Sequence, residues 1–122
     1  MHYMLLIYGP EGGAMDTSPE EQAKSMQEWG DYTAWLKDKG WLIAGDALHP
    51  TSEATTVRHA DGSTMTTDGP FAETKEQLGG YYLLDCANLD EAIEAGSRTP
   101  IRAGSIEIRP VMHFDDEGRP TS

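Results

Sequence analysis

Charged residues that could carry out acid–base chemistry cluster in one short stretch of the chain. Glu73, Lys75 and Glu76 place two carboxylates beside an ammonium group within four residues. In a cleft, such a set can transfer protons or orient an anionic ligand. On a surface, the same run is solvated charge that contributes little. The residues alone leave both interpretations open.

The residues just before this cluster indicate a rigid loop. In the run Asp68-Gly69-Pro70, Asp can accept backbone hydrogen bonds, Gly permits positive φ and Pro prevents strand pairing. We expect Asp68 to organise the loop through such bonds and Phe71 to anchor it apolarly. Rigid loops of this kind often carry binding sites.

A pocket beside this loop would draw on residues from several parts of the chain. The candidate catalytic residues are Asp68, Glu73 and Lys75, and the candidate ligand-binding residues are Tyr8, Glu53, Arg58, Phe71, Tyr82 and Arg109. We expect Glu73 and Lys75 to face a pocket bordered by Tyr8 or Tyr82. The alternative for the two tyrosines is packing in the core or an interface.

The two candidate arginines also have a structural alternative. Arg58 and Arg109 could form cross-strand ion pairs with Glu53 or Glu107. That role would place them on a sheet surface rather than in a pocket.

Metal and cofactor chemistry is not indicated by the sequence. The four histidines, His2, His49, His59 and His113, lack metal-ligand spacing, and the one cysteine, Cys86, has no neighbouring histidine. No glycine-rich cofactor fingerprint is present, and Gly9 to Gly13 is interpreted as a loop only. We therefore expect no metal and no organic cofactor.

Clear helix and turn signals divide the chain into elements. Ser18 as N-cap, Pro19 at the first helical position and Glu21 three residues after the cap predict a helix over 19–39, closed by Gly40. Its apolar face is predicted from residues at helical spacing, namely Ala23, Met26, Gly30, Thr33 and Leu36, widened by Trp29, Tyr32 and Trp35.

The remaining elements are mostly strands. Apolar or alternating runs predict strands over 2–8, 41–48, 78–86 and 105–111, and Asn88 followed by Glu91 predicts a second helix over 89–97. Asp61-Gly62 predicts a tight hairpin between 54–59 and 63–67. The order β-α-β, hairpin, β-α-β predicts an α+β, ferredoxin-like βαββαβ fold with an inserted β-hairpin.

Two strands are apolar on both sides. Tyr3, Leu5 and Ile7 alternate with apolar neighbours, and Tyr81 to Leu84 repeats the pattern. Helices can cover only one face of such a sheet, and soluble proteins seldom expose a large apolar patch. We expect sheet-to-sheet homodimerisation; the alternative is that the tail or the hairpin folds over that face.

Composition limits the classes of partner. Nine basic and 21 acidic residues give a net charge of −12, and the basic residues are scattered, so no nucleic-acid partner is expected. The longest apolar run, Tyr3 to Tyr8, is too short for a membrane span, and no signal peptide is indicated. A single cysteine fits a reducing cytoplasm. We expect one domain over 1–112 and a polar C-terminal tail over 113–122.

Three segments carry a family resemblance. Thr67 to Gly80, with Tyr3 to Tyr8 before it and Glu107 to Met112 after it, closely resembles the YCII-related proteins of the DGPF subtype, named for the tetrapeptide at 68–71. Glu53 to Arg58 also resembles this subtype. The resemblance implies a dimeric α+β barrel.

The resemblance leaves two classes of function. One is a cofactor-independent enzyme or ligand-binding protein that acts on a small organic molecule near the 68–76 loop. The other is a non-catalytic regulatory or binding partner associated with a sigma factor of the extracytoplasmic-function (ECF) type. The better-characterised branch of the family is thought to use a His on or near the first helix with an Asp, and no His lies between Pro19 and Trp41 here.

Overall fold

The computed structural model describes residues 1–10 and 18–122 and shows an α+β fold of two layers. The elements, in chain order, are β1 (His2–Pro10), α1 (Pro19–Asp38), β2 (Leu42–Ala47), the short 3-10 helix η1 (Thr51–Glu53), β3 (Thr55–Ala60), β4 (Ser63–Asp68), β5 (Glu76–Asp85), α2 (Leu89–Ser97) and β6 (Ser105–Pro110). The predicted elements are thus present, with bounds shifted by a residue or two. Most of the loop expected over residues 9–13 lies outside the described residues.

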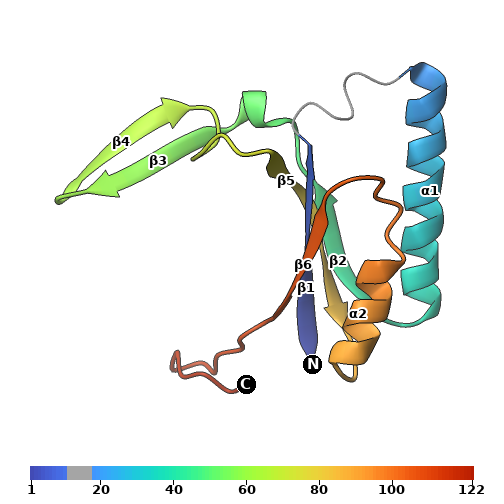
Figure 1. The fold of residues 1–122 in the computed structure, drawn as a ribbon. Coiled ribbons are helices and arrows are strands. Elements are labelled where there is room, and N and C mark those ends of the chain that lie inside the picture. The colour runs from blue at the N-terminus through green and yellow to red at the C-terminus, as the bar shows by residue number, and fades with distance from the viewer. Residues whose placement is uncertain (11–17) are drawn as a thin grey trace.

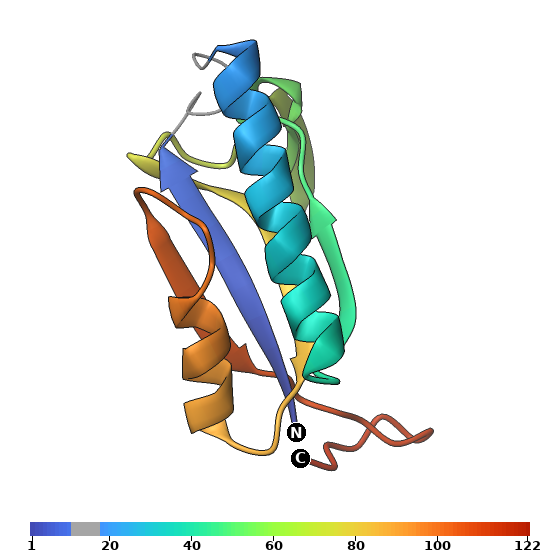
Figure 2. The ribbon, with the colours of Figure 1, turned by 90° about the vertical axis from the view of Figure 1, so that its right-hand side faces the viewer.

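The main sheet has four strands in the order β2-β5-β1-β6, and every neighbouring pair is antiparallel. Each of the two units β1-α1-β2 and β5-α2-β6 crosses over one strand of the other unit. This interlocking order confirms the predicted ferredoxin-like arrangement. Both helices cover the same face of the sheet (Figures 1 and 2), and the sheet of one chain does not close into a barrel.

Local signals explain where α1 begins and ends. The Ser18 hydroxyl accepts a hydrogen bond from the Glu21 backbone N–H at 3.2 Å, as an N-cap should. At the other end Gly40 has φ of 75°, and the Trp41 N–H reaches back to the Leu36 carbonyl at 3.1 Å. This pattern is a Schellman motif, which requires the left-handed conformation that glycine adopts readily.

The core lies between the helices and the sheet. Leu5 and Leu84 from the sheet, Leu36 from α1 and Ala92 from α2 are completely buried there. The Tyr32 hydroxyl donates a hydrogen bond of 2.6 Å to the Ala95 carbonyl and so ties the two helices together. Burial of these apolar side chains provides the main stabilisation of the domain.

The buried face of α1 differs from the predicted one. Only Tyr32 and Leu36 are buried, whereas Met26 is 76% exposed, and Ala23 and Gly30 are exposed as well. The first turns of α1 extend beyond the end of the sheet (Figure 2), so no strand of the sheet lies beneath their apolar residues. The aromatic residues, rather than the Ala23–Met26–Gly30 row, mark the core side of this helix.

The hairpin forms a separate two-stranded sheet, which we call the arm (β3 and β4, residues 55–68). Its tip has Asp61 at φ 50° and Gly62 at φ 81°, which confirms the predicted Asp-Gly turn. The arm projects from the side of the sheet that the helices leave uncovered, and the C-terminal tail projects from the same side further down (Figure 1). Neither segment lies flat on the sheet.

Candidate functional site

The sheet face opposite the helices is apolar, and we call it the open face. Direct cross-strand partners share a face, so Met4–Leu83 and Leu6–Tyr81 lie on the side away from the core residue Leu5. The open face is made of Met4, Leu6, Tyr8, Leu78, Tyr81 and Leu83. All but Leu78 are half-buried in the single chain, and Leu78 is 37% exposed.

Polar groups border the open face on the outer strands. The Tyr81 hydroxyl donates a hydrogen bond of 2.6 Å to an Asp46 carboxylate oxygen on β2. That hydrogen bond and the negative charge of Asp46 raise the pKa of Tyr81. On β6, Arg109 lies opposite Met4 and Glu107 opposite Leu6.

The two tyrosines predicted as alternative pocket borders lie on opposite sides of the sheet. Tyr8 is on the open face beside Leu78 and Ser105. Tyr82 points to α1, where its hydroxyl is 2.8 Å from the Thr33 hydroxyl and its ring stacks on Trp29. Tyr82 therefore takes the packing role, and it cannot line a pocket together with Tyr8.

Residues 68–76 connect the arm to β5 and are held by hydrogen bonds to the arm. The Gly69 N–H donates to the Ala54 carbonyl at 2.7 Å, and the Thr56 hydroxyl donates to the Gly69 carbonyl at 2.7 Å. Arg58 donates to the Phe71 carbonyl. Gly69 has φ of 102°, a conformation that favours glycine.

The predicted role of Asp68 in this loop is not observed. Its carboxylate is exposed and accepts no hydrogen bond from the residues that the structure describes. Thr56 and Arg58 on the arm hold the loop instead, because the backbone of residues 69–71 runs back alongside β3. Sequence spacing gave no sign that the arm's own side chains would do this.

The predicted apolar anchor is also absent from the single chain. Phe71 is 70% exposed, and Glu73 and Lys75 are exposed too. The loop follows the arm away from the domain core, so Phe71 is not packed against an apolar layer of residues 1–10 or 18–122. In one copy, Glu73 and Lys75 do not face a closed pocket.

The other candidates have separate partners. Glu53 is exposed on η1, and its carboxylate oxygen Oε2 lies 3.3 Å from Nδ1 of His49. Within residues 1–10 and 18–122, neither Arg58 nor Arg109 forms the cross-strand ion pair with Glu53 or Glu107 that was predicted as an alternative. Arg58 sits across from Met65 on the arm, and Arg109 borders the open face.

One hydrogen bond links the 68–76 segment to the open face. The Glu76 carboxylate accepts a bond of 2.8 Å from the Ser105 hydroxyl, and Ser105 is the cross-strand partner of Tyr8. The end of the open face near the arm thus combines a phenol, a hydroxyl and a carboxylate with the apolar Leu78. A second chain lying on this face would enclose these groups.

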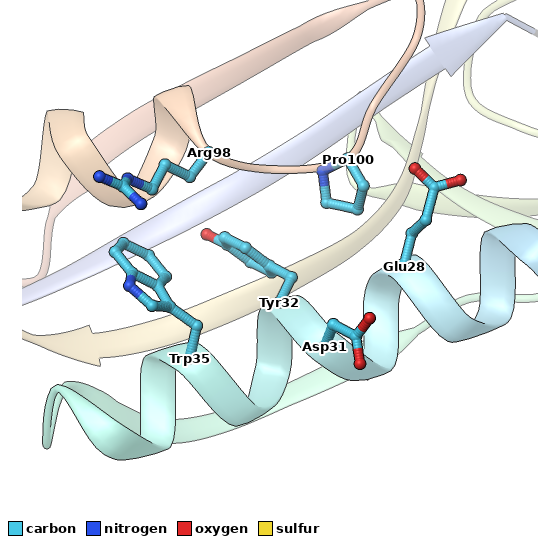
Figure 3. A pocket seen from close by; sticks show the side chains of 6 residues that line it. All are labelled: Glu28, Asp31, Tyr32, Trp35, Arg98 and Pro100. Carbon is cyan, nitrogen blue, oxygen red and sulfur yellow. The ribbon is translucent and has the colours of Figure 1, made fainter.

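The helix side carries a groove that the sequence did not indicate. It has a volume of about 330 Å³ and is lined by Glu28, Asp31, Tyr32, Trp35, Arg98 and Pro100 (Figure 3). Burial raises the pKa of Tyr32 well above its usual range, so its phenol stays protonated. Residues 28, 31, 32 and 35 share one side of α1 by helical spacing, but nothing in the sequence paired them with Arg98.

Other chemistry-bearing residues do not assemble into a centre. Among the described residues, no three His, Cys, Asp or Glu side chains lie together in a way that could hold a metal ion. Cys86 is 2% exposed in the core, and burial raises the pKa of its thiol to about 11. Across the described ranges, no helix is long and apolar enough to cross a membrane.

Comparisons with known proteins place this chain in a family. The sequence matches the family model described as the YCII-related domain over residues 1–115. It is also 41% identical over 117 residues to an uncharacterised protein of Rhizobium meliloti (strain 1021). That alignment covers 93% of this chain and 94% of the relative.

Proposed function

The chain belongs to the YCII-related domain family, and we propose that it is a cytoplasmic homodimer that binds a small organic molecule without a cofactor. The binding pocket would lie at the arm end of the open face, beside residues 68–76, and would be closed by the second copy. The observation that carries this proposal is the open face itself, an apolar sheet surface over which none of the residues described in the structure forms a layer.

The apolar character of the open face supports self-association. Six apolar or aromatic side chains, Met4, Leu6, Tyr8, Leu78, Tyr81 and Leu83, form one continuous surface over β1 and β5. Covering such a surface removes apolar area from water, which stabilises the complex by a free energy of about 25 cal/mol per Å² buried. A second open face is a suitable cover because the contact would be self-complementary, as a two-fold interface requires. Two sheets facing each other would give the dimeric α+β barrel that the family resemblance implies.

The arm supports the same arrangement. A two-stranded hairpin alone is at best marginally stable in water, and this one exposes Val57 and Met65. The arm and the tail project from opposite ends of the open face, toward the region that a second copy would occupy (Figure 1). In the proposed dimer each arm would lie against the partner and bring Phe71 into an apolar environment.

The groups at the arm end of the open face would determine the ligand. Tyr8 and Leu78 form an apolar surface, and the hydrogen-bonded pair Glu76–Ser105 places polar groups beside it. Lys75 on the adjoining loop would attract an anionic group of the ligand. Glu73, two residues before Lys75, could exchange a proton with the ligand. A small organic acid with an apolar body matches this set.

The dimer can be tested by sedimentation velocity at micromolar concentration. The parent should sediment as a species of twice 13.4 kDa. Leu6→Glu places a charge at the centre of the open face and should yield monomers. Met26→Glu makes the same change at an exposed position on α1 and should leave the dimer intact. A parent that sediments only as a 13.4 kDa species would refute the proposal.

The ligand site needs a separate measurement. Small aromatic carboxylates would be titrated into labelled protein, following the backbone amides of Tyr8, Leu78 and Ser105 by NMR. We expect saturable shifts in the parent and their loss in Lys75→Ala, with Lys24→Ala on α1 as the matched control. Equal shifts in all three proteins would argue against a site beside residues 68–76.

A second candidate function follows from charge. The net charge of −12, with exposed carboxylates such as Asp90 and Glu94 on α2, would suit a basic protein partner. The family resemblance suggests a sigma factor of the ECF type as that partner. Calorimetric titration with such a factor would detect a complex that weakens steeply as salt is raised; no heat at low salt would exclude this candidate.

A further inference from the structure

We propose that the groove between α1 and the segment after α2 binds a small zwitterion. In this site Arg98 would hold a carboxylate and Asp31 an ammonium group, with the apolar body of the ligand against aromatic side chains. The site lies on the helix side of the sheet and does not depend on the dimer or on residues 68–76 (Figure 3).

The cationic end of the groove is formed by Arg98, which makes a cation–π contact with Trp35. The Arg98 guanidinium carbon lies 5.0 Å from the centroid of the Trp35 ring. Arg98 makes no ion pair or side-chain hydrogen bond with the residues that the structure describes. This cation–π contact holds the guanidinium beside the groove and leaves its N–H groups available to bind a carboxylate.

The anionic end is one helical turn away. Asp31 accepts a hydrogen bond of 2.9 Å from Gln27, and within residues 1–10 and 18–122 it has no cationic partner. Glu28 is already paired with Arg102 at 2.6 Å. Asp31 is therefore the carboxylate that can receive an ammonium group. Four residues of helix separate Asp31 from Trp35, a rise of about 6 Å.

The floor between these charges is apolar. Tyr32 has its hydroxyl committed to the Ala95 carbonyl, so it offers the groove mainly the face of its ring. Trp35 and Pro100 complete the floor and one wall (Figure 3). The groove has a volume of about 330 Å³ and is shallow and open to solvent, so it can hold only a small molecule and leaves part of it exposed. The ligand is accordingly a compact molecule whose two charges are separated by a short apolar body.

Three probes of one shape separate the contributions of the two charges. Para-aminomethylbenzoate carries both charges, benzylamine only the cation and para-toluate only the anion. Each is titrated into full-length labelled protein, and the Trp35 indole N–H signal is followed by NMR. We expect the zwitterion to bind with a dissociation constant about tenfold lower than that of either single-charge probe, which corresponds to about 1.4 kcal/mol.

Two variants assign the charges to their residues. Arg98→Gln should raise the dissociation constant of the zwitterion to that of benzylamine, and Asp31→Asn should raise it to that of para-toluate. Lys37→Gln, which removes an exposed cation from the side of α1 opposite the groove, is the matched control and should change nothing. All three positions are exposed, so the variants should fold like the parent, which circular dichroism checks.

Several results would overturn the assignment. They are the absence of a saturable Trp35 shift up to about 10 mM probe, equal dissociation constants for the three probes, and an effect of only one of the two variants. The last result would mean that the groove recognises a single charge rather than a zwitterion.

Discussion

Tyr81 and Tyr82 are neighbours in the sequence with opposite environments in the fold. Tyr81 lies on the open face with its hydroxyl on Asp46, whereas Tyr82 packs between the sheet and α1. Gly45 on β2 makes room for the Tyr82 ring, because a Cβ there would lie 2.7 Å from a ring carbon. At the residue scale, the face of the strand decides whether a tyrosine serves the core or a candidate interface.

Cys86 provides a test of burial at the same scale. Its thiol pKa of about 11 lies above the value of about 8.5 in an unfolded chain. The folded protein therefore retains a proton that the unfolded chain loses, so this residue reduces stability as pH rises from about 8.5 to 11. We expect slow alkylation of Cys86 in native protein at pH 8 and a smaller alkaline loss of stability in Cys86→Ala. Rapid labelling without denaturant would contradict this burial.

Thr56 and Asp68 test which residue holds the loop after the arm. Thr56→Val removes the hydrogen bond to the Gly69 carbonyl and should cost about 1 kcal/mol of local stability. Asp68→Ala should change local stability by less than about 0.5 kcal/mol, because the side chain is exposed. Hydrogen exchange of the arm amides measures the change in local stability in both variants. Faster exchange in Asp68→Ala than in Thr56→Val would restore the role first predicted for Asp68.

At the element scale, short connections determine how helices and strands meet. Between α2 and β6 the chain passes Gly104, which has φ of 129°. A Cβ at this position would lie 2.1 Å from the Tyr8 carbonyl oxygen and 3.1 Å from the Gly9 Cα. The glycine therefore lets the start of β6 approach β1 and places Ser105 opposite Tyr8.

Substituting two glycines separates this close approach from backbone strain. Gly104→Ala should destabilise the domain by about 3 kcal/mol or more, because it adds a clash with backbone to an unfavourable φ. Gly118 also has a positive φ, 79°, but a Cβ there would meet nothing within 4 Å, so Gly118→Ala should lower the free energy of unfolding by about 1 kcal/mol. Urea denaturation measures the loss of unfolding free energy in both variants. Equal losses would show that β6 can shift to accept the methyl group.

At the scale of the whole molecule, the two faces of one sheet have different surroundings. The helices bury one face, and the arm and the tail frame the other without covering it (Figure 1). The proposed dimer and the proposed zwitterion groove therefore use opposite sides of the molecule. A ligand in the groove would not compete with a second copy on the open face.

Removing the arm tests its role in the proposed dimer. The Gly69 N–H donates a hydrogen bond of 2.7 Å to the Ala54 carbonyl, so the two ends of the arm lie close together. Residues 55–68 can therefore be deleted and residues 54 and 69 joined by a short glycine linker. The shortened chain should keep its helical circular dichroism, because the arm is a sheet of its own. We expect its dimer dissociation constant to rise at least about tenfold, as lost apolar contacts weaken association. An unchanged constant in sedimentation equilibrium would show that the arm does not contact the partner.

The elements and the fold class can be predicted from the amino-acid sequence, because their signals are local. The Ser18 cap, Gly40, the Asp61-Gly62 turn and the Asn88 cap each act within a few residues, and the apolar runs indicated which segments form the sheet. The motif at 68–71 is a local pattern of the same kind. The surroundings of its side chains depend on distant residues, and in the single chain both Asp68 and Phe71 are exposed.

Contacts between residues far apart in the sequence depend on how the elements pack in three dimensions. The tertiary structure placed Tyr8 and Tyr82 on opposite faces, because the strand register fixes which side chains share a face. It also brought Arg98 onto Trp35, which lies on another helix, and so formed the groove. Such contacts depend on how helices pack against a sheet, and no local pattern encodes that geometry.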